Sequence, residues 1–329
     1  MLIEADYQGE IQGENQIDLI SMPSENINQT VYSKYFGFLQ SPFTSLPKKC
    51  FFFEHVSASE VINTVVFSLN SGESIVKVTG DAGVGKTFLI RQVLSSLGDD
   101  YFAINMITPN LSPNIFLKSL IEELGATCPL DANDAQLIKY IQYLLYDHYS
   151  KSDYKIVVWV DDAHTLSADT LEIILALSKL ETSHRSLLQF VISGSKKLDD
   201  TLSLDAMRSF KDRITFSSVL RGLKYSEVQA YVESHLRIVG ADNPECFSRS
   251  AMQTLFKKTS GIPARINKLS HKALMLAFGK GDARVEKSHV IKAAYEDTQP
   301  HTINMLFIAP LAVVLITGVI ALYFNWLSL

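Results

Sequence analysis

The segment GDAGVGKT at positions 80–87 constrains the fold of this chain more than any other feature. It matches the pattern GxxxxGK[ST], and it lies between a short apolar run ending in glycine and a segment with helical periodicity. In such a loop, glycines let backbone N–H groups surround phosphates, and the helix N-terminus and the lysine attract their charge. The threonine hydroxyl is suited to bind Mg²⁺. We therefore predict an ATP and Mg²⁺ site, with the metal on Thr87 and the nucleotide on Gly80, Asp81, Ala82, Gly83, Val84, Gly85, Lys86, Thr87 and Phe88.

Helical and strand-like segments alternate around this loop. We expect helices at 57–69, 88–97, 113–124, 136–148 and 167–180, with Ser112 and Ser167 as caps. We expect strands at 73–80, 101–107, 156–160, 187–193 and 214–216. This alternation favours an α/β fold, a parallel sheet flanked by helices. After Gly222 only helical patterns follow, at 226–239, 248–258, 263–278 and 286–295.

The charge pattern and the aromatic residues divide the chain further. Residues 1–33 contain six acids and no Lys or Arg, so we expect 1–31 to be a disordered acidic tail. An α/β domain is expected at 32–222 and a small helical lid domain at 223–299. Aromatic residues gather between positions 32 and 53. They form either a docking surface for a partner or a layer packed on the α/β core.

The last part of the chain has the character of a membrane span. Residues 305–327 form a run of 23 residues without a charge. A helix of that length reaches roughly 35 Å, which is enough for a hydrocarbon core of about 30 Å. Tyr323 and Trp326 lie near its far end, where interfacial aromatics are typical. We predict a transmembrane helix at 304–327, with the preceding domains in the cytoplasm.

The composition argues against several other functions. The net charge is −5, and the acidic N-terminal residues account for it, so the remainder is close to neutral. That balance makes a nucleic-acid partner unlikely, because DNA-binding proteins usually carry a basic excess. The three cysteines are far apart, and neither HExxH nor CxxC occurs. We expect a reducing compartment and no metal held by protein ligands alone.

Two adjacent acids follow the strand-like run IVVWV at 156–160. In P-loop proteins an acid at the end of another central strand helps to hold the metal, and Asp161 is in that place. Asp162 comes next, where many ATPases of this kind have a glutamate that polarises the attacking water. Aspartate is one methylene shorter. Asp162 is therefore either a catalytic base with slow turnover or a surface carboxylate.

Other polar residues fit a nucleotide-sensing set. Ser195 follows the 187–193 strand, where a hydroxyl can contact the γ-phosphate or the attacking water. Arg208 and Arg213 precede the last strand, and either can act as an arginine finger toward a neighbouring subunit or form a surface salt bridge. Arg265 lies on the first turn of the 263–278 helix, either facing the nucleotide or contributing ordinary surface charge.

In these motifs the chain resembles AAA+ ATPases of the general secretion pathway A type (ExeA-like) and the related MSHA pilus-biogenesis ATPases. The resemblance covers roughly residues 32–295. It rests on FGFLQSPF, VTGDAGVGKT, the acid pair followed by Ala-His, SGSKKLDDTL, DRI and GIPARIN. Three positions depart from the family pattern: Asp162 replaces Glu, Ser195 stands in the place of Gln, and Ala264 occupies the usual arginine place.

The resemblance implies a cytoplasmic ATPase domain tied to the bacterial inner membrane, forming a homo-oligomer and serving secretion or pilus components of the cell envelope. Two other functions fit the same residues. One is a DNA-associated regulator of the transposition or replication type, because such ATPases share this core. The other is a nucleotide-gated scaffold with weak turnover, because Asp162 and Ala264 depart from the hydrolytic pattern.

Overall fold

The computed structural model describes residues 30–43, 51–106, 112–152, 154–182, 186–241 and 243–298. These ranges begin at residue 30, so almost all of the predicted acidic tail at 1–31 lies outside the described residues. The predicted transmembrane helix at 304–327 also lies outside them. Within the described ranges, no helix is both long enough and apolar enough to cross a bilayer.

A five-stranded parallel sheet forms the centre of the α/β part, as predicted. Its strand order is β2-β3-β4-β1-β5. The strands are β1 (Ile75–Gly80), β2 (Tyr101–Met106), β3 (Lys155–Val160), β4 (Leu188–Gly194) and β5 (Ile214–Leu220). Each neighbouring pair is parallel. Since parallel strands share a direction, the C-terminal ends of β1, β3 and β4 meet at one edge of the sheet.

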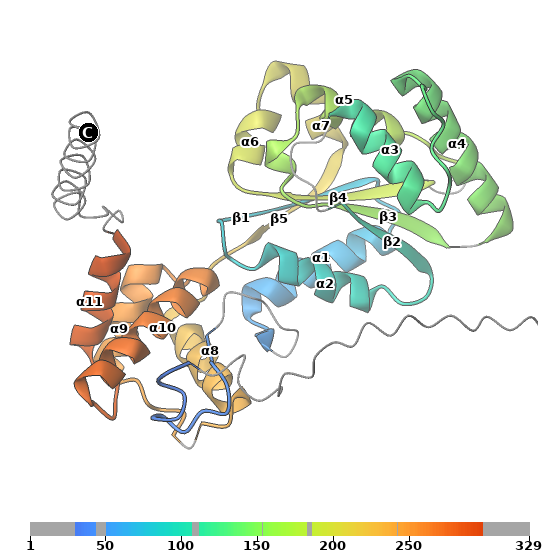
Figure 1. The fold of residues 1–329 in the computed structure, drawn as a ribbon. Helices are drawn as coiled ribbons and strands as arrows, with labels where there is room; N and C mark the ends of the chain where they lie inside the picture. Colours follow the sequence, from blue (N-terminus) through green and yellow to red (C-terminus); the bar gives the residue numbers. More distant parts are fainter. Residues whose placement is uncertain are drawn as a thin grey trace, which may run out of the picture.

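Helices cover both faces of the sheet (Figure 1). One face carries α1 (Val56–Asn70) and α2 (Lys86–Ser96). The other carries α3 (Pro113–Glu123), α4 (Asp134–Lys151), α5 (Ala168–Leu177), α6 (Lys197–Leu202) and α7 (Arg208–Arg213). Two short 3₁₀ turns complete this part, η2 (Ala163–Thr165) and η3 (Asp205–Met207). The strands β1, β3 and β4 are buried along almost their whole length, which explains their continuous apolar runs.

Both serines predicted as helix caps lie at N-cap positions, but only one of them forms a side-chain hydrogen bond to the helix. Ser167 is the N-cap of α5, and its hydroxyl accepts a hydrogen bond from the Thr170 N–H at 3.2 Å. Ser112 is the N-cap of α3 without a side-chain cap bond. The start of α4 was predicted two residues late, because Asn133 and Gln136 form a reciprocal capping box that begins the helix at Asp134.

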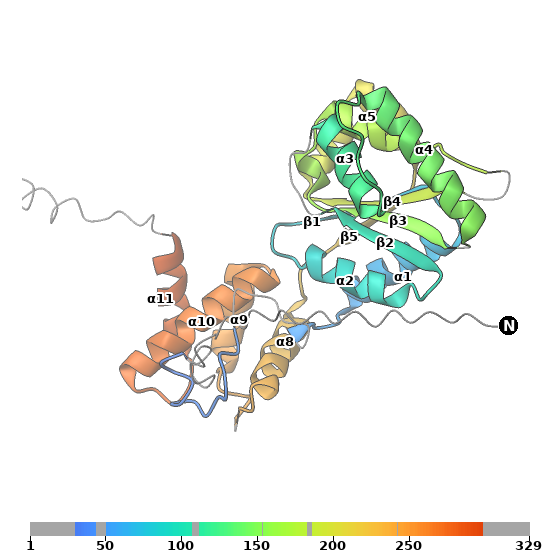
Figure 2. The same cartoon turned by 45° about the vertical axis from the view of Figure 1, so that its right-hand side comes forward.

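Four helices follow the sheet and pack beside it: α8 (Tyr225–Ile238), α9 (Arg249–Thr259), α10 (Pro263–Lys280) and α11 (Lys287–Thr298). Figures 1 and 2 show them as a separate bundle, reached through the end of β5. The bundle has its own hydrophobic cluster. Aromatic residues of the N-terminal segment, Tyr32, Phe38 and Phe43, belong to this cluster. The segment is thus a packed layer, and most of it covers the helical bundle, whereas Phe52 packs against the core of the α/β part.

His235 of α8 shows how closely the segment packs. Its ring is stacked between Phe51, with centroids 4.9 Å apart, and Phe43, with centroids 5.8 Å apart. His235 Nδ1 lies 3.0 Å from the Tyr231 carbonyl oxygen. Since a carbonyl only accepts, Nδ1 carries the hydrogen and donates it. Burial lowers the pKa of His235 to about 4 from its ordinary 6.5.

This pKa predicts acid sensitivity. As the pH falls below 6.5, the unfolded chain binds a proton at this position, whereas the folded chain stays neutral down to about 4. The stability due to neutral His235 is therefore complete above pH 6.5 and is lost between pH 6.5 and 4. We expect the thermal unfolding midpoint of the parent to fall more across this window than that of His235→Phe. An equally steep fall in the variant would contradict this assignment.

Candidate nucleotide-binding site

The P-loop connects the end of β1 to the start of α2. Gly83 (φ 79°) and Gly85 (φ 109°) adopt left-handed backbone conformations, which residues with a Cβ rarely take. Gly85 is the N-cap of α2, so the first turn of that helix, with its unpaired N–H groups, faces the loop. The loop glycines and the start of α2 therefore have a backbone arrangement that can surround an anion.

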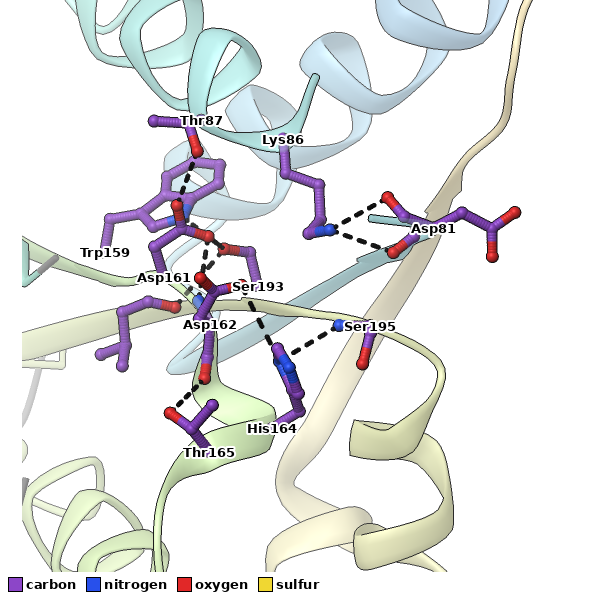
Figure 3. A network of polar contacts seen from close by, with 12 residues as sticks. Asp81, Lys86, Thr87, Trp159, Asp161, Asp162, His164, Thr165, Ser193 and Ser195 are labelled. Atoms are coloured by element: carbon purple, nitrogen blue, oxygen red, sulfur yellow. Dashed lines mark hydrogen bonds and ion pairs between the residues drawn. The ribbon is translucent and has the colours of Figure 1, made fainter. Parts of the chain in front are cut away.

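Lys86 and Thr87 follow this loop at the start of α2 and make separate polar contacts (Figure 3). The buried Lys86 amine donates hydrogen bonds to the carbonyl oxygens of Gly80 at 3.0 Å and Asp81 at 3.2 Å. The Thr87 hydroxyl donates to Asp161 Oδ2 at 2.9 Å. The two residues predicted to share a metal, 74 positions apart, are thus in direct contact.

The Asp161 carboxylate is buried and held by further donors. Its Oδ1 accepts hydrogen bonds from the Ser193 hydroxyl at 2.6 Å and from the Asp162 N–H at 3.0 Å. The Trp159 indole N–H in turn donates to Ser193 Oγ at 3.0 Å. These donors are neutral, so they orient the carboxylate without cancelling its negative charge. Sequence reasoning missed Ser193 and Trp159, because their role depends on β3 and β4 being neighbours.

This arrangement suits Mg²⁺. A carboxylate next to a hydroxyl offers hard oxygen ligands, and Mg²⁺ typically keeps several waters and phosphate oxygens beside one or two such groups. Among the described residues, no cluster of three or more His, Cys, Asp or Glu side chains could hold a metal without a substrate.

Asp162 has an unusual backbone and an exposed side chain. Its φ is 50°, in the left-handed region that aspartate tolerates better than most residues with a Cβ. The side chain is 53 % exposed, and its Oδ1 lies 3.8 Å from His164 Nδ1. That nitrogen accepts a long hydrogen bond, 3.4 Å, from the Ser195 N–H. His164 Nδ1 therefore lies between the Ser195 N–H and the Asp162 carboxylate.

Ser195 stands at the end of β4 with a free hydroxyl. Among the described residues, its Oγ has no hydrogen-bond partner although it is inaccessible to solvent. Such orphaned polar atoms often face a ligand. Ser195 lines a cavity of about 1040 Å³ together with Lys86, Asp161 and Asp162. The structure thus brings these four predicted residues to one cavity.

The helical bundle forms the opposite wall of that cavity. The N–H of Ala264, in the first turn of α10, donates to the Gly83 carbonyl oxygen at 3.1 Å. A Cβ on Gly83 would lie only 2.7 Å from the Ala264 Cβ, so both small residues are needed for this contact. The cavity wall continues along α10 with Asn267, Lys268, His271 and Lys272.

Arg265 was predicted to face the nucleotide, and the structure places it differently. It is exposed and does not line the cavity. Each residue turns a helix by about 100°, so the position after Ala264 points away from the face that Ala264, Lys268 and Lys272 share. The cationic side chains of α10 on the cavity wall are the two lysines. Helical spacing counted from Ala264 would have identified them.

Arg213 lies far from the P-loop of its own chain. It precedes Ile214, which pairs with Ile75 at the N-terminal end of β1, whereas the P-loop follows the C-terminal end. Its Nη2 donates to Ser74 Oγ at 3.0 Å and to the Ser178 carbonyl oxygen at 3.1 Å, and it also pairs with Glu181. Arg213 therefore joins segments at the far edge of the sheet. Arg208, at the start of α7, is exposed.

The fold and the site together define a P-loop NTPase of the AAA+ class. A family model for the AAA domain matches residues 69–202. The general secretion pathway protein A of Aeromonas hydrophila is 30 % identical over 269 residues, which are 81 % of this chain and 48 % of that protein. The chain is therefore similar to the ExeA-like AAA+ ATPases, and it spans about half the length of this relative.

Two solved structures show the same fold at low identity. The Aeropyrum pernix ORC2 protein, solved as ADPNP-ADP complexes, is 15 % identical with a TM-score of 0.55, and the match covers 76 % of this chain and 72 % of that one. Drosophila ORC bound to DNA is 14 % identical with a TM-score of 0.59, and the match covers 89 % and 71 % of the two chains. These similarities establish the architecture alone.

The Arg213 contacts predict a structural effect. We expect Arg213→Ala to destabilise the fold by about 1–2 kcal/mol, because several hydrogen bonds at the far edge of the sheet are lost. Thermal unfolding should show a lower midpoint for Arg213→Ala and an unchanged midpoint for the matched variant Arg208→Ala. An unchanged midpoint in Arg213→Ala, together with loss of ATP turnover, would instead assign this residue to a neighbour's nucleotide.

Proposed function

We propose that this protein binds Mg-ATP in the described cavity and hydrolyses it, as a membrane-anchored AAA+ ATPase of a bacterial envelope system. The observation that carries the proposal is the contact between Thr87 and Asp161, which joins the P-loop to a buried carboxylate oriented by Ser193. That geometry supplies the two protein ligands that a P-loop metal requires.

The cavity residues take distinct roles in this proposal. Thr87 and Asp161 hold Mg²⁺, which would neutralise phosphate charge. Residues 80–88 surround the phosphates, with the Lys86 amine exchanging its loop carbonyl partners for phosphate oxygens. Lys268 and Lys272 add positive charge from α10, on the same cavity wall as Ala264. The orphaned Ser195 hydroxyl donates to the γ-phosphate or to the attacking water.

Asp162 is the proposed base. Among the described residues, no hydrogen bond is recorded to its carboxylate, and it lines the cavity beside Asp161. A carboxylate without donors retains its capacity to accept a proton from water. Its short side chain must act over a greater distance than a glutamate would, so we propose slow turnover. His164 limits the positions that the Asp162 side chain can take.

The cellular setting is also part of the proposal. The relative's name refers to a general secretion pathway, and secretion or pilus components are the proposed partners. The uncharged run at 305–327 supports a single-pass anchor in the inner membrane, with the α/β domain at 32–222 and the helical lid at 223–299 in the cytoplasm. Assembly into a homo-oligomer would bring exposed Arg208 toward a neighbour's phosphates.

Variants of Lys86 and of the two adjacent acids test the proposed ATP binding and hydrolysis. We expect Lys86→Ala to abolish ATP binding and Asp161→Asn to abolish Mg²⁺-dependent turnover. Asp162→Asn should keep ATP binding and lower kcat by about 100-fold, because the positioned base is lost. The exposed Asp169→Asn, in the first turn of α5, serves as the matched control and should keep the parent rate.

Steady-state ATPase assays and equilibrium binding separate the outcomes. Parent turnover in Asp162→Asn would show that Asp162 is not the base. Tight Mg-ATP binding by a parent chain without turnover would replace the ATPase with a nucleotide-gated scaffold. Salt-sensitive binding of duplex DNA by the parent would favour the DNA-associated regulator.

A further inference from the structure

The last helix of the bundle presents a basic and apolar outer face. In α11, His289, Val290 and Ala293 are buried against the bundle. The opposite side carries Lys287, Ser288, Ile291, Lys292 and Tyr295, all of which are exposed. Ile291 is 45 % and Tyr295 64 % exposed. No residue of α11 lines the nucleotide cavity, so this outer face has no part in the site described above.

This outer face combines basic and apolar side chains. Two lysines flank a branched aliphatic side chain and a tyrosine, and no acid lies among these five residues. The acids of α11 are Glu296 and Asp297, both in its last turn, and by helical spacing Glu296 lies beside Lys292 at the border of the stripe. Lysine stems and tyrosine rings are suited to the boundary between water and lipid, because each has an apolar body and a polar tip.

The distance along the chain restricts what this face can meet. Six residues, 299–304, separate α11 from the uncharged run at 305–327. Even fully extended, six residues span only about 20 Å. If 305–327 crosses the membrane, the end of α11 is held within that distance of the lipid headgroups. The short connection then keeps the outer face of α11 close to the bilayer, so the effective concentration of lipid headgroups around it stays high.

We propose that the outer face of α11, formed by Lys287, Ser288, Ile291, Lys292 and Tyr295, lies on an anionic lipid surface. This inference rests on the proposed anchoring through 305–327. The lysines meet phospholipid headgroups, and Ile291 and Tyr295 enter the interfacial layer. This contact sets the orientation of the helical bundle relative to the membrane. Because α10 belongs to the bundle, the cavity wall that it forms is oriented as well.

The experiment uses the full-length chain in nanodiscs of phosphatidylcholine alone or mixed with phosphatidylglycerol. An amine-reactive acetylating reagent is added, and mass spectrometry measures the modification rate of each lysine. We expect the rates of Lys287 and Lys292 to fall by roughly fivefold in anionic nanodiscs, which corresponds to about 1 kcal/mol per lysine beside an anionic surface. Lys139 on α4 and Lys258 on α9, both exposed, are the reference lysines and should react equally in both lipids.

A matched pair of surface variants tests the face itself. Ser288→Glu places an acid in its middle and should restore rapid modification of Lys287 and Lys292 in anionic nanodiscs. Ser226→Glu, at an exposed position of α8, should leave their protection unchanged.

The outcomes separate the lipid contact from the anchor. A chain that resists carbonate extraction from vesicles, but whose Lys287 and Lys292 react equally in both lipids, overturns the lipid contact and leaves the anchor in place. A chain that carbonate releases overturns both. Protection of the two lysines by duplex DNA in neutral nanodiscs, without protection by anionic lipid, would assign the face to nucleic acid and also overturn the lipid contact.

Discussion

The hydrogen bonds around the Asp161 carboxylate connect the parts on which this protein's site depends. Asp161 follows β3, Ser193 is on β4, and Thr87 is in the first turn of the helix that follows β1. The strand order β3-β4-β1 places these three positions at one edge of the sheet. An isolated carboxylate would be costly to bury there, and its neutral donors lower that cost while preserving its charge. The same negative charge makes this edge suited to a divalent cation, which can in turn bind a polyphosphate.

The second wall of the cavity depends on a close backbone contact. Ala264 and Gly83 approach so tightly that a side chain on the glycine would collide with the alanine Cβ. The P-loop is thereby hydrogen-bonded to the first turn of α10. Because of this hydrogen bond, a movement of the phosphate-binding loop would displace the first turn of α10. The lysines of the bundle lie along the same cavity wall. This contact joins the P-loop to α10, the helix that packs against α11.

Features encoded by local spacing could be predicted from the sequence. The P-loop, the parallel sheet and the acid after β3 each follow from a motif or a hydrophobic period, and the structure contains all three. Features that depend on strand order could not be predicted in this way, because the Ser193–Asp161 contact joins residues 32 positions apart. Arg265 was predicted to face the nucleotide because it lies on the first turn of this helix, and the helical phase turns it away from the cavity. For the aromatic N-terminal segment the sequence left a docking surface and a packed layer open, and the helical bundle was not foreseen as the main packing partner, since apolar composition does not specify one. The roles of Asp162 and Ser195 remain predictions, as does the membrane span, which lies outside the described residues.

The central claim is that Ser193 orients Asp161 for Mg²⁺, and it can be tested by one titration. The affinity for a fluorescent ATP analogue would be measured in the parent and in Ser193→Ala, each with Mg²⁺ and with a chelator. We predict that Mg²⁺ strengthens binding in the parent and that the variant loses about 10-fold or more of this effect, as expected when a metal ligand loses its hydrogen-bond support. Binding in chelator should be unchanged, which also shows that the variant is folded. An equal Mg²⁺ effect in both proteins would contradict the account.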